Sequence, residues 1–374
     1  MSSTWGETVK ISIFGESHGK AIGVVLDGLP AGEKIDLDSV ALQMSRRAPG
    51  RDSTSTPREE SDLPQIVSGM LNDTTTGAPL CALIENTNTR SGDYDNLKLV
   101  PRPGHADFPA HLRYGGYNDV RGGGHFSGRL TAPLVFAGAV CRQILQRRGI
   151  LIGAHVFSVK DVTDDPFDPV YIPEDLLASL SSVYFPVINE NAKQKMRDTI
   201  EAARLAQNSV GGVVECAVTG LSAGVGGPLF GGIEPVFSSI LFGIPAVKGV
   251  EFGAGFGGSA LFGSENNDPY FCDGGTVKTK TNHAGGILGG ISTGMPVLFR
   301  AAFKPTPSIA LEQDSVDLTA KENTKLSVHG RHDPCIVPRA VPVVEAAAAV
   351  ALMNLINLHT GGMKAWPLKK SDRK

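Results

Sequence analysis

Residues 9–32 read VKISIFGESHGKAIGVVLDGLPAG. The parts at 9–14 and 22–27 are rich in apolar and β-branched residues, which is typical of strands, and a glycine-rich turn separates them. Helical periodicity follows at 37–47, with Asp36 placed as an N-cap. This order of strand, strand and helix returns later in the chain. It favours an α+β fold over a regular alternation of parallel strands and crossover helices.

Part of this stretch has a second copy in the chain. GVV at 23–25 leads to GLPAG at 28–32, and GVV at 212–214 leads to GLSAG at 220–224. The two copies differ in the spacing between their parts, and the match is short. Such self-similarity is what a duplicated structural unit leaves in a sequence. We therefore consider an internal repeat of about half the chain.

The remaining elements follow from the same patterns. Further strands are predicted at 80–85, 150–159, 212–219, 247–252 and 296–303. Further helices are predicted at 133–148, 191–208, 234–241 and 341–358, and Gly149 is a plausible stop for the first of these. The 45 glycines and 24 prolines are spread along the chain, which indicates ordered loops and no linker. We expect one domain over residues 1–364 and a polar tail at 365–374.

Composition excludes several classes of function. The formal net charge is only −3, so no overall attraction to nucleic acid or to an anionic membrane is expected. The longest apolar run, 346–353, is far shorter than the roughly 20 residues of a membrane span and predicts a buried helix. Five widely spaced cysteines give no metal or redox pair, and no metal site is expected. Without a recognisable signal peptide, the expected location is the cytoplasm.

Two segments near the N-terminus could carry chemistry. GESHG at 15–19 directly follows a strand, so His18 can reach a ligand without being covered by neighbouring side chains, although a solvated turn is the alternative. The segment 46–58 holds four arginines and one aspartate. Arginine suits planar, bidentate contact with carboxylate or phosphate, while Arg46 and Arg47 would equally suit a helix end. The four are Arg46, Arg47, Arg51 and Arg58.

Three later segments add candidates. RPGHAD at 102–107 and RGGGHFSGR at 121–129 place histidines among arginines in rigid or glycine-rich loops, and the N-terminus of the following helix would favour an anion. KPTPS at 304–308 could hold a phosphate, although a plain turn is the simpler interpretation. In RHDP at 331–334, Asp333 between positive neighbours could act as a general base or could cap the next helix.

Six segments, in order and over nearly the whole chain, resemble the motifs of the chorismate synthase family. They are GESHG through DGLP at 15–30, RPGHAD at 102–107, GHFSGR at 124–129, AVKGVE at 246–251, NHAGG at 282–286, and RHDP at 331–334 with the helix that follows. Two departures from the family pattern are present. Arg46-Arg47-Ala48 stands where many members have three arginines, and Gly243-Ile244-Pro245-Ala246 stands where many have Ser-Ile-Asn-Ala.

The resemblance implies a fold and a reaction. The fold would be a sandwich in which a helical layer lies between two antiparallel sheets related by internal pseudo-symmetry, assembled as a homotetramer. The reaction would be the 1,4-anti elimination of phosphate from 5-enolpyruvylshikimate 3-phosphate, giving chorismate in the last common step of aromatic amino acid biosynthesis. It would use reduced FMN without net redox change, and the flavin would be reduced by an external partner.

The resemblance also implies roles for individual positions. His18 would serve the substrate's phosphate, His105 the flavin, and Asp333 would assist proton removal. Seven residues would contact the substrate: Ser17, Arg47, Arg51, Arg102, Ser127, Arg129 and Arg331. Eight would contact the cofactor, with the first two at its phosphate: Lys304, Ser308, Ser127, Gly128, Arg129, Ala246, Gly289 and Arg331. Two alternatives stay open: an FMN-dependent oxidoreductase acting on an anionic metabolite, and a binder of phosphorylated metabolites without catalysis.

Overall fold

The computed structural model describes residues 3–50, 62–87, 97–328 and 332–360. Two five-stranded antiparallel sheets dominate it. The first sheet has the order β1 (Thr4–Trp5), β2 (Lys10–Gly15), β3 (Ala21–Asp27), β7 (Leu80–Glu85) and β4 (Gln65–Ser68). The second has the order β11 (Val247–Phe252), β16 (Val297–Phe303), β10 (Gly212–Thr219), β8 (Leu151–Val159) and β9 (Val162–Thr163).

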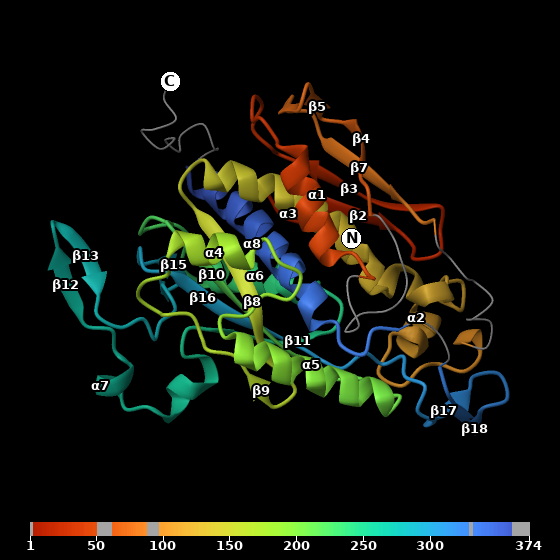
Figure 1. Ribbon diagram of the computed structural model, residues 1–374. Helices are drawn as coiled ribbons and strands as arrows, with labels where there is room; N and C mark the ends of the chain where they lie inside the picture. The colour runs from red at the N-terminus through yellow and green to blue at the C-terminus, as the bar shows by residue number, and fades with distance from the viewer. Residues whose placement is uncertain (1–2, 51–61, 88–96, 329–331, 361–374) are drawn as a thin grey trace.

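Four helices form a layer between the two sheets, as Figure 1 shows. They are α1 (Leu37–Arg47), α3 (Thr131–Gln146), α6 (Ile233–Leu241) and α8 (Val337–Thr360). Two more, α4 (Glu174–Leu180) and α5 (Glu190–Leu205), cover the far face of the second sheet. Strand β8 is accordingly buried almost throughout, whereas β7 alternates between buried and partly exposed residues. The predicted α+β sandwich with a central helical layer is confirmed.

The smaller elements are short helices and hairpins outside these layers. The helical ones are α2 (Asp107–Tyr114), α7 (Gly263–Asn266) and the 3₁₀ segments η2 (Arg121–Phe126), η3 (Gly128–Leu130), η4 (Leu229–Gly231) and η5 (Gly255–Ala260). The hairpins are β5 (Met70–Leu71) with β6 (Thr74–Thr75), β12 (Tyr270–Asp273) with β13 (Thr276–Thr279), β14 (Ile287–Leu288) with β15 (Ile291–Ser292), and β17 (Gln313–Asp317) with β18 (Glu322–Leu326).

The main elements repeat in sequence order. The series β2, β3, α1, β4, β7, α3 corresponds to β8, β10, α6, β11, β16, α8, and both series pair their strands in the same way. The correspondence reaches single hydrogen bonds. Thr75 Oγ1 donates to the Pro30 carbonyl over 2.7 Å, and Ser292 Oγ donates to the Ser222 carbonyl over 2.6 Å. The sequence echo is therefore the trace of a structural duplication.

The same geometry requires a glycine at the start of the repeated turn in each half. Gly28 and Gly220 have φ values of 86° and 75°, in the left-handed region. A β-carbon at Gly28 would lie 1.9 Å from the Thr8 carbonyl oxygen, and one at Gly220 would lie 2.0 Å from that of Gly149. The turn after β3 thus passes directly over the residue two positions before β2. In the second half, the turn after β10 passes in the same way over the residue two positions before β8.

The centre of the fold is the contact between α3 and α8. Both helices are almost entirely buried, and a β-carbon on Gly138 would lie only 2.2 Å from the Cα and Cβ atoms of Ala346. By length and composition α8 could cross a membrane, but 94% of its apolar window is buried inside the protein. Helix α8 begins at Val337, before the predicted start at 341, and Pro342 lies inside it. Pro338 and Pro342 lie near its start. Because proline is unfavourable inside a helix, the sequence pattern did not predict the first turn.

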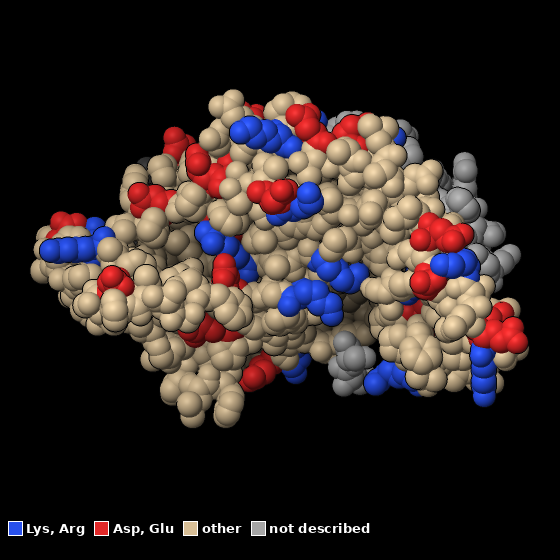
Figure 2. Space-filling view, turned by 90° about the horizontal axis from the view of Figure 1, so that it is seen from below, with Lys and Arg blue, Asp and Glu red and all other residues tan. Residues whose placement is uncertain are grey.

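Charge on the surface is mixed. In Figure 2, which views the molecule from below, basic and acidic side chains are interspersed over the described part of that face. This distribution agrees with the small net charge of −3.

We expect Gly138→Ala to lower the free energy of unfolding by about 1–3 kcal/mol, the usual cost of overpacking a core. The sign is the opposite of the usual effect, since alanine in a helix is normally better than glycine by about 1 kcal/mol. Gly263→Ala in α7 is the control, because a β-carbon there meets no atom within 4 Å. Urea unfolding of both variants measures the difference, and equal stability of Gly138→Ala and the parent would contradict the close contact.

Candidate functional site

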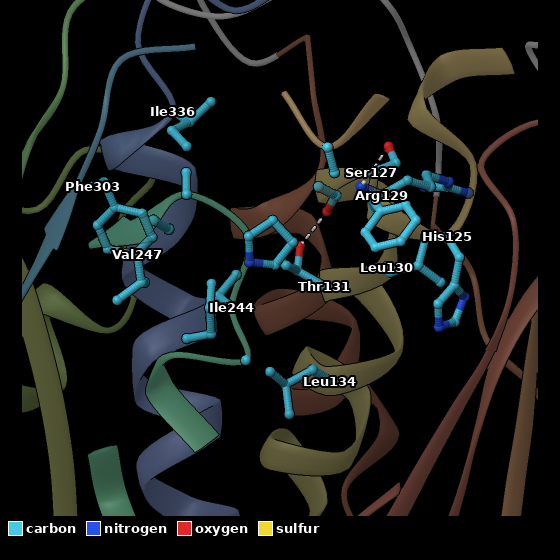
Figure 3. A pocket seen from close by; sticks show the side chains of 18 of the residues that line it. His125, Ser127, Arg129, Leu130, Thr131, Leu134, Ile244, Val247, Phe303 and Ile336 are labelled. Carbon is cyan, nitrogen blue, oxygen red and sulfur yellow. Dashed lines mark hydrogen bonds between the residues drawn. The ribbon is translucent and has the colours of Figure 1, made fainter. Parts of the chain in front are cut away.

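A cavity of about 1100 Å³ lies at one end of the helical layer, where α1 and α6 end and α3 and α8 begin. The duplicated halves meet here, and each contributes one wall. Figure 3 shows His125, Ser127, Arg129 and Thr131 from the first half facing an apolar group from the second half. That group is Ile244, Val247, Phe303 and Ile336. We call the first group the polar wall and the second group the apolar wall. Leu130 and Leu134 lie beside the polar wall, and charged residues of the second half also line the cavity, namely Lys248, Lys304, Asp333 and Arg339.

The polar wall is built on two buried arginines that share one carboxylate. Arg47, the last residue of α1, donates to Asp62 Oδ2 over 2.8 Å, to Thr131 Oγ1 over 3.0 Å and to the Gly128 carbonyl over 2.8 Å. Arg129 forms an ion pair with the other oxygen of Asp62. Ser127 Oγ accepts a hydrogen bond from the Arg129 amide over 3.2 Å. These contacts fix both guanidinium groups beside the cavity.

The charges in this group remain ionised at neutral pH. Burial lowers the pKa of Arg47 to about 10, although the charge of Asp62 opposes this effect. Burial would raise the pKa of Asp62, but Arg47 and Arg129 hold it below its ordinary value. Asp62 thus lies between two cationic side chains. An anionic ligand that reaches this wall would meet guanidinium groups that are already fixed in position.

Arg46 has a different role from its neighbour Arg47. Its Nη1 donates to Glu345 Oε2 of α8 over 2.5 Å inside the core, and Arg142 Nη1 donates to the same oxygen over 3.1 Å. Successive helical residues point about 100° apart, so only one of the two arginines can face the cavity. Arg47 is the one that lines the cavity. Arg51, Arg58 and Arg331 lie outside the described residues.

Two histidines lie against successive glycines of η2. A β-carbon on Gly122 would lie 2.7 Å from His18 Nε2, and one on Gly123 would lie 3.1 Å from His105 Nε2. Both glycines have positive φ, 59° and 84°. Side chains at these positions would crowd the imidazole rings. His105 and Ser17 line the cavity, whereas His18 is buried and is not among the residues that line it.

His125 connects the glycine turn to the first sheet. Its Nδ1 lies 2.7 Å from the Gly15 carbonyl oxygen, and its Nε2 lies 2.8 Å from Ser3 Oγ. The N-terminal strand reaches across the cavity in addition, since Trp5 Nε1 donates to Ser239 Oγ of α6 over 2.8 Å. Trp5 and His125 are cavity residues that the implied site did not include.

A second positive group lies where β16 ends. Lys304 and Lys248 both line the cavity, and Arg102 Nη1 donates to Ser308 Oγ over 3.0 Å. Burial, followed by the positive charges of Lys248 and Arg102, lowers the pKa of Lys304. An anion bound here would relieve the repulsion among these cations.

The loop before α8 contributes an ion pair that sequence reasoning did not identify. Asp333 pairs with Arg339 of α8, and Arg339 Nε donates to the Arg47 carbonyl over 3.0 Å. Burial alone would lower the pKa of Arg339, but the charge of Asp333 holds it above its ordinary value. The expected cationic neighbour was Arg331, so Arg339 is a new member of the site. An arginine inside an apolar helix was the signal that could have identified it.

The backbone positions implied for the cofactor divide into two groups. Gly128 and Ala246 line the cavity, and Ala246 has a φ of 76°, which is costly for a residue with a side chain. Its carbonyl accepts a hydrogen bond from the Lys304 amide over 3.0 Å. Gly289 lies in the turn between β14 and β15 and is not among the residues that line the cavity.

Comparison with known proteins adds to this geometry. A family model described as chorismate synthase matches residues 9–356. The chain is 46% identical over 367 residues to a chorismate synthase of Lancefieldella parvula, covering 95% of this chain and 96% of that protein. It is 45% identical over 361 residues to that of Thermococcus kodakarensis, with 96% and 98% covered. A crystal structure of chorismate synthase superposes with a TM-score of 0.76 and 25% identity over 96% of each chain.

We expect Asp62→Asn to lower the free energy of unfolding by about 3–5 kcal/mol at pH 7, because it leaves two buried arginines without their shared anion. The contribution of a carboxylate with a lowered pKa is present above its unfolded pKa of about 3.9 and is lost as pH falls through the folded value. The difference between parent and variant should therefore shrink towards acid pH. Denaturant unfolding between pH 7 and pH 2 measures it, because the loss occurs below the unfolded pKa.

Asp273→Asn is the control, because Asp273 forms an exposed ion pair with Lys278. Its effect should be small, because exposed ion pairs contribute little to stability. A similar small effect for Asp62→Asn, or a difference independent of pH, would contradict the ionised cluster.

Proposed function

Because this chain belongs to the chorismate synthase family and is a carbon–oxygen lyase, we propose that its cavity eliminates phosphate from 5-enolpyruvylshikimate 3-phosphate in the 1,4-anti sense. The product is chorismate, and reduced FMN is the cofactor, without net redox change. The observation that carries this proposal is one cavity that is lined both by several cationic side chains and by a group of apolar ones. The roles below are proposals of the same kind.

The cationic wall suits the substrate. The substrate has two carboxylates and a phosphate, so it needs several fixed positive groups in surroundings from which water can be excluded. Three arginines line the cavity: Arg47 and Arg129, which share Asp62, and Arg102. Ser17 and Ser127 would donate hydrogen bonds. Arg51 and Arg331 keep their proposed substrate contacts on the motif resemblance alone.

The apolar wall suits FMN. Ile244, Val247, Phe303 and Ile336 offer a surface for a flat ring, and the mutually repelling Lys304 and Lys248 offer a place for its phosphate. A volume of about 1100 Å³ is enough for a flavin and a small acid, since pockets for one ligand usually have about 300–1000 Å³. When bound, reduced FMN supplies the electron density that no side chain can provide. Gly128 and Ala246 would offer backbone groups, and Gly289 stays a prediction.

Each of three titratable residues would have one role in the proton transfers. His18, against Gly122, would give a proton to the departing phosphate, and His105, against Gly123, would face the flavin. Asp333 would assist removal of the substrate proton, and its ion pair with Arg339 would hold the carboxylate in place. Such positioned acids and bases typically contribute factors of about 10² to 10⁴ in rate.

The surface supports assembly of several copies. Leu229, Phe230, Phe256 and Phe262 are exposed by 79%, 90%, 83% and 76%, and they lie on η4, η5 and the segment before α7. Large apolar side chains so exposed usually mark a contact with another chain. We infer a homotetramer that acts in the cytoplasm as one catalytic domain over residues 1–364, supplied with reduced flavin by an external partner.

The protein should release phosphate and chorismate under anaerobic conditions when chemically reduced FMN is supplied. Oxidised FMN with NADPH should give no turnover in a preparation free of other proteins. A flavin spectrum recorded before and after many turnovers should show the same reduced state. Stoichiometric oxidation of the flavin with each turnover would instead identify an oxidoreductase, and binding without phosphate release would identify a non-catalytic binder.

Asp333→Asn should lower turnover by about 10² to 10⁴, because it removes the basic group while keeping its shape. The ion pair with the buried Arg339 is lost as well, so stability should also fall, by about 1–3 kcal/mol. Stopped-flow turnover and thermal unfolding measure the two effects.

Arg339→Gln is the matched variant, because it breaks the same ion pair and keeps the carboxylate. Its turnover should fall far less than that of Asp333→Asn. Equal losses in the two variants would show that the ion pair holds the loop and that Asp333 is not a base.

A further inference from the structure

Asp107 is a buried carboxylate beside His105, and none of the roles above includes it. It is the first residue of α2, and its side chain turns back towards the preceding loop. Its Oδ2 accepts hydrogen bonds from Arg102 Nε over 2.7 Å and from the Arg102 amide over 3.0 Å. Its Oδ1 accepts one from Arg102 Nη2 over 2.8 Å. Arg102 therefore fixes the carboxylate through both oxygens.

The distance from Asp107 to His105 locates a proton. His105 Nδ1 lies 2.6 Å from Asp107 Oδ1, and two lone pairs would repel each other at this separation, so one proton lies between them. Burial would raise the pKa of Asp107, but hydrogen bonds from Arg102 and His105 hold it well below its usual range. The carboxylate is therefore ionised, and the proton belongs to the imidazole.

The other possible partner of His105 Nδ1 does not change this assignment. Arg102 Nη2 lies 3.1 Å from the same nitrogen. If Nδ1 accepted a proton from Arg102, its contact with Asp107 would join two acceptors at 2.6 Å. Both nitrogens instead converge as donors on Asp107 Oδ1.

His105 Nε2 is the other ring nitrogen. The side chain of His105 lines the cavity, and Gly123 places no β-carbon against Nε2. Arg102 Nη2 lies 3.4 Å from Nε2, and this donor suits a nitrogen that carries no proton. We propose that Asp107 is a positioning residue that fixes neutral His105 as the Nδ1–H tautomer, so that Nε2 is the nitrogen that exchanges a proton. The kinetic part of this proposal rests on the proposed role of His105, whereas the tautomer is a property of the free protein.

Other charged groups lie near His105. Arg102 comes from the same loop and loses its carboxylate partner when Asp107 is substituted. Lys304 from the segment after β16 is close enough to interact with Arg102 electrostatically, and His18 and the ion pair between Asp119 and Arg121 lie beyond the glycine turn. An effect that acts through Arg102 would persist without His105, so comparing backgrounds with and without His105 separates it from an effect on the imidazole.

The tautomer is measured by ¹⁵N NMR of histidine-labelled protein without flavin or substrate, and His105→Gln assigns the signal. In the parent, neutral His105 should carry its proton on Nδ1. In Asp107→Ala, which removes the acceptor, a mixture with the Nε2–H form should appear. A proton on Nε2 in the parent, or an unchanged Nδ1–H signal in Asp107→Ala, would overturn the proposal. The parent spectrum decides even if the variant does not fold.

The kinetic test uses the complete reaction with reduced FMN. Asp107→Ala should lower kcat by about tenfold or more while KM changes by less than about threefold. In a His105→Ala background the same substitution should cause no further loss. Asp38→Asn, which removes an exposed acidic residue from the first turn of α1, should leave kcat unchanged.

An equal loss from Asp107→Ala in both backgrounds would show that Asp107 acts independently of His105 and would overturn its positioning role. If His105→Ala alone keeps full turnover, the proposed function of His105 fails, and the NMR measurement still decides the tautomer. The two failures are therefore distinguishable.

Discussion

The contact between α3 and α8 is the constraint on which the rest of the structure depends. Gly138 lets the two helices approach until its α-carbon faces the backbone of Ala346, and the small side chains around them would leave voids at a wider spacing. The two helices occupy corresponding places in the duplicated halves, and both begin at the cavity. Their N-termini therefore bring the same partial positive charge to one place, in addition to the charged side chains.

Duplication gives the cavity two walls from corresponding elements, and sequence divergence made them chemically different. The end of α1 and the start of α3 supply Arg47 and Arg129, whereas the end of α6 and the strand after it supply Ile244 and Val247. A symmetric cavity would bind two similar ligands. This one can place an anion-rich molecule against a flat apolar one, which is the arrangement that the proposed reaction needs.

The buried charged groups at the cavity form small clusters in which each charge has a partner of opposite sign. Arg47 and Arg129 share Asp62, Arg339 pairs with Asp333, and Asp107 is held by Arg102. Each set is costly to desolvate and more costly to break, because a lost partner leaves an unpaired buried charge. In return the donors are fixed before a ligand arrives, which reduces the reorganisation that accompanies charge movement in a reaction.

Local sequence determined much of this protein: seven of the ten strands of the two sheets, the central helices, the repeat and the ordered motifs that identify the family. Strand and helix periodicities and glycine turns depend on neighbours along the chain, so one sequence suffices to predict them. The sequence did not predict the short edge strands β1, β4 and β9, and it did not predict α2, α4 and the first turn of α8, because these elements are short or contain proline.

Only the tertiary structure decided which charges meet. Arg46 and Arg47 are adjacent, yet one lies in the core with Glu345 and the other faces the cavity with Asp62. Asp333 forms an ion pair with Arg339 of the following helix, and Asp107 contacts His105 of the preceding loop. Sequence motifs placed these residue types in the right loops. Their partners depend on side-chain direction and on elements distant in the chain, and these are fixed only when the helical layer packs between the two sheets.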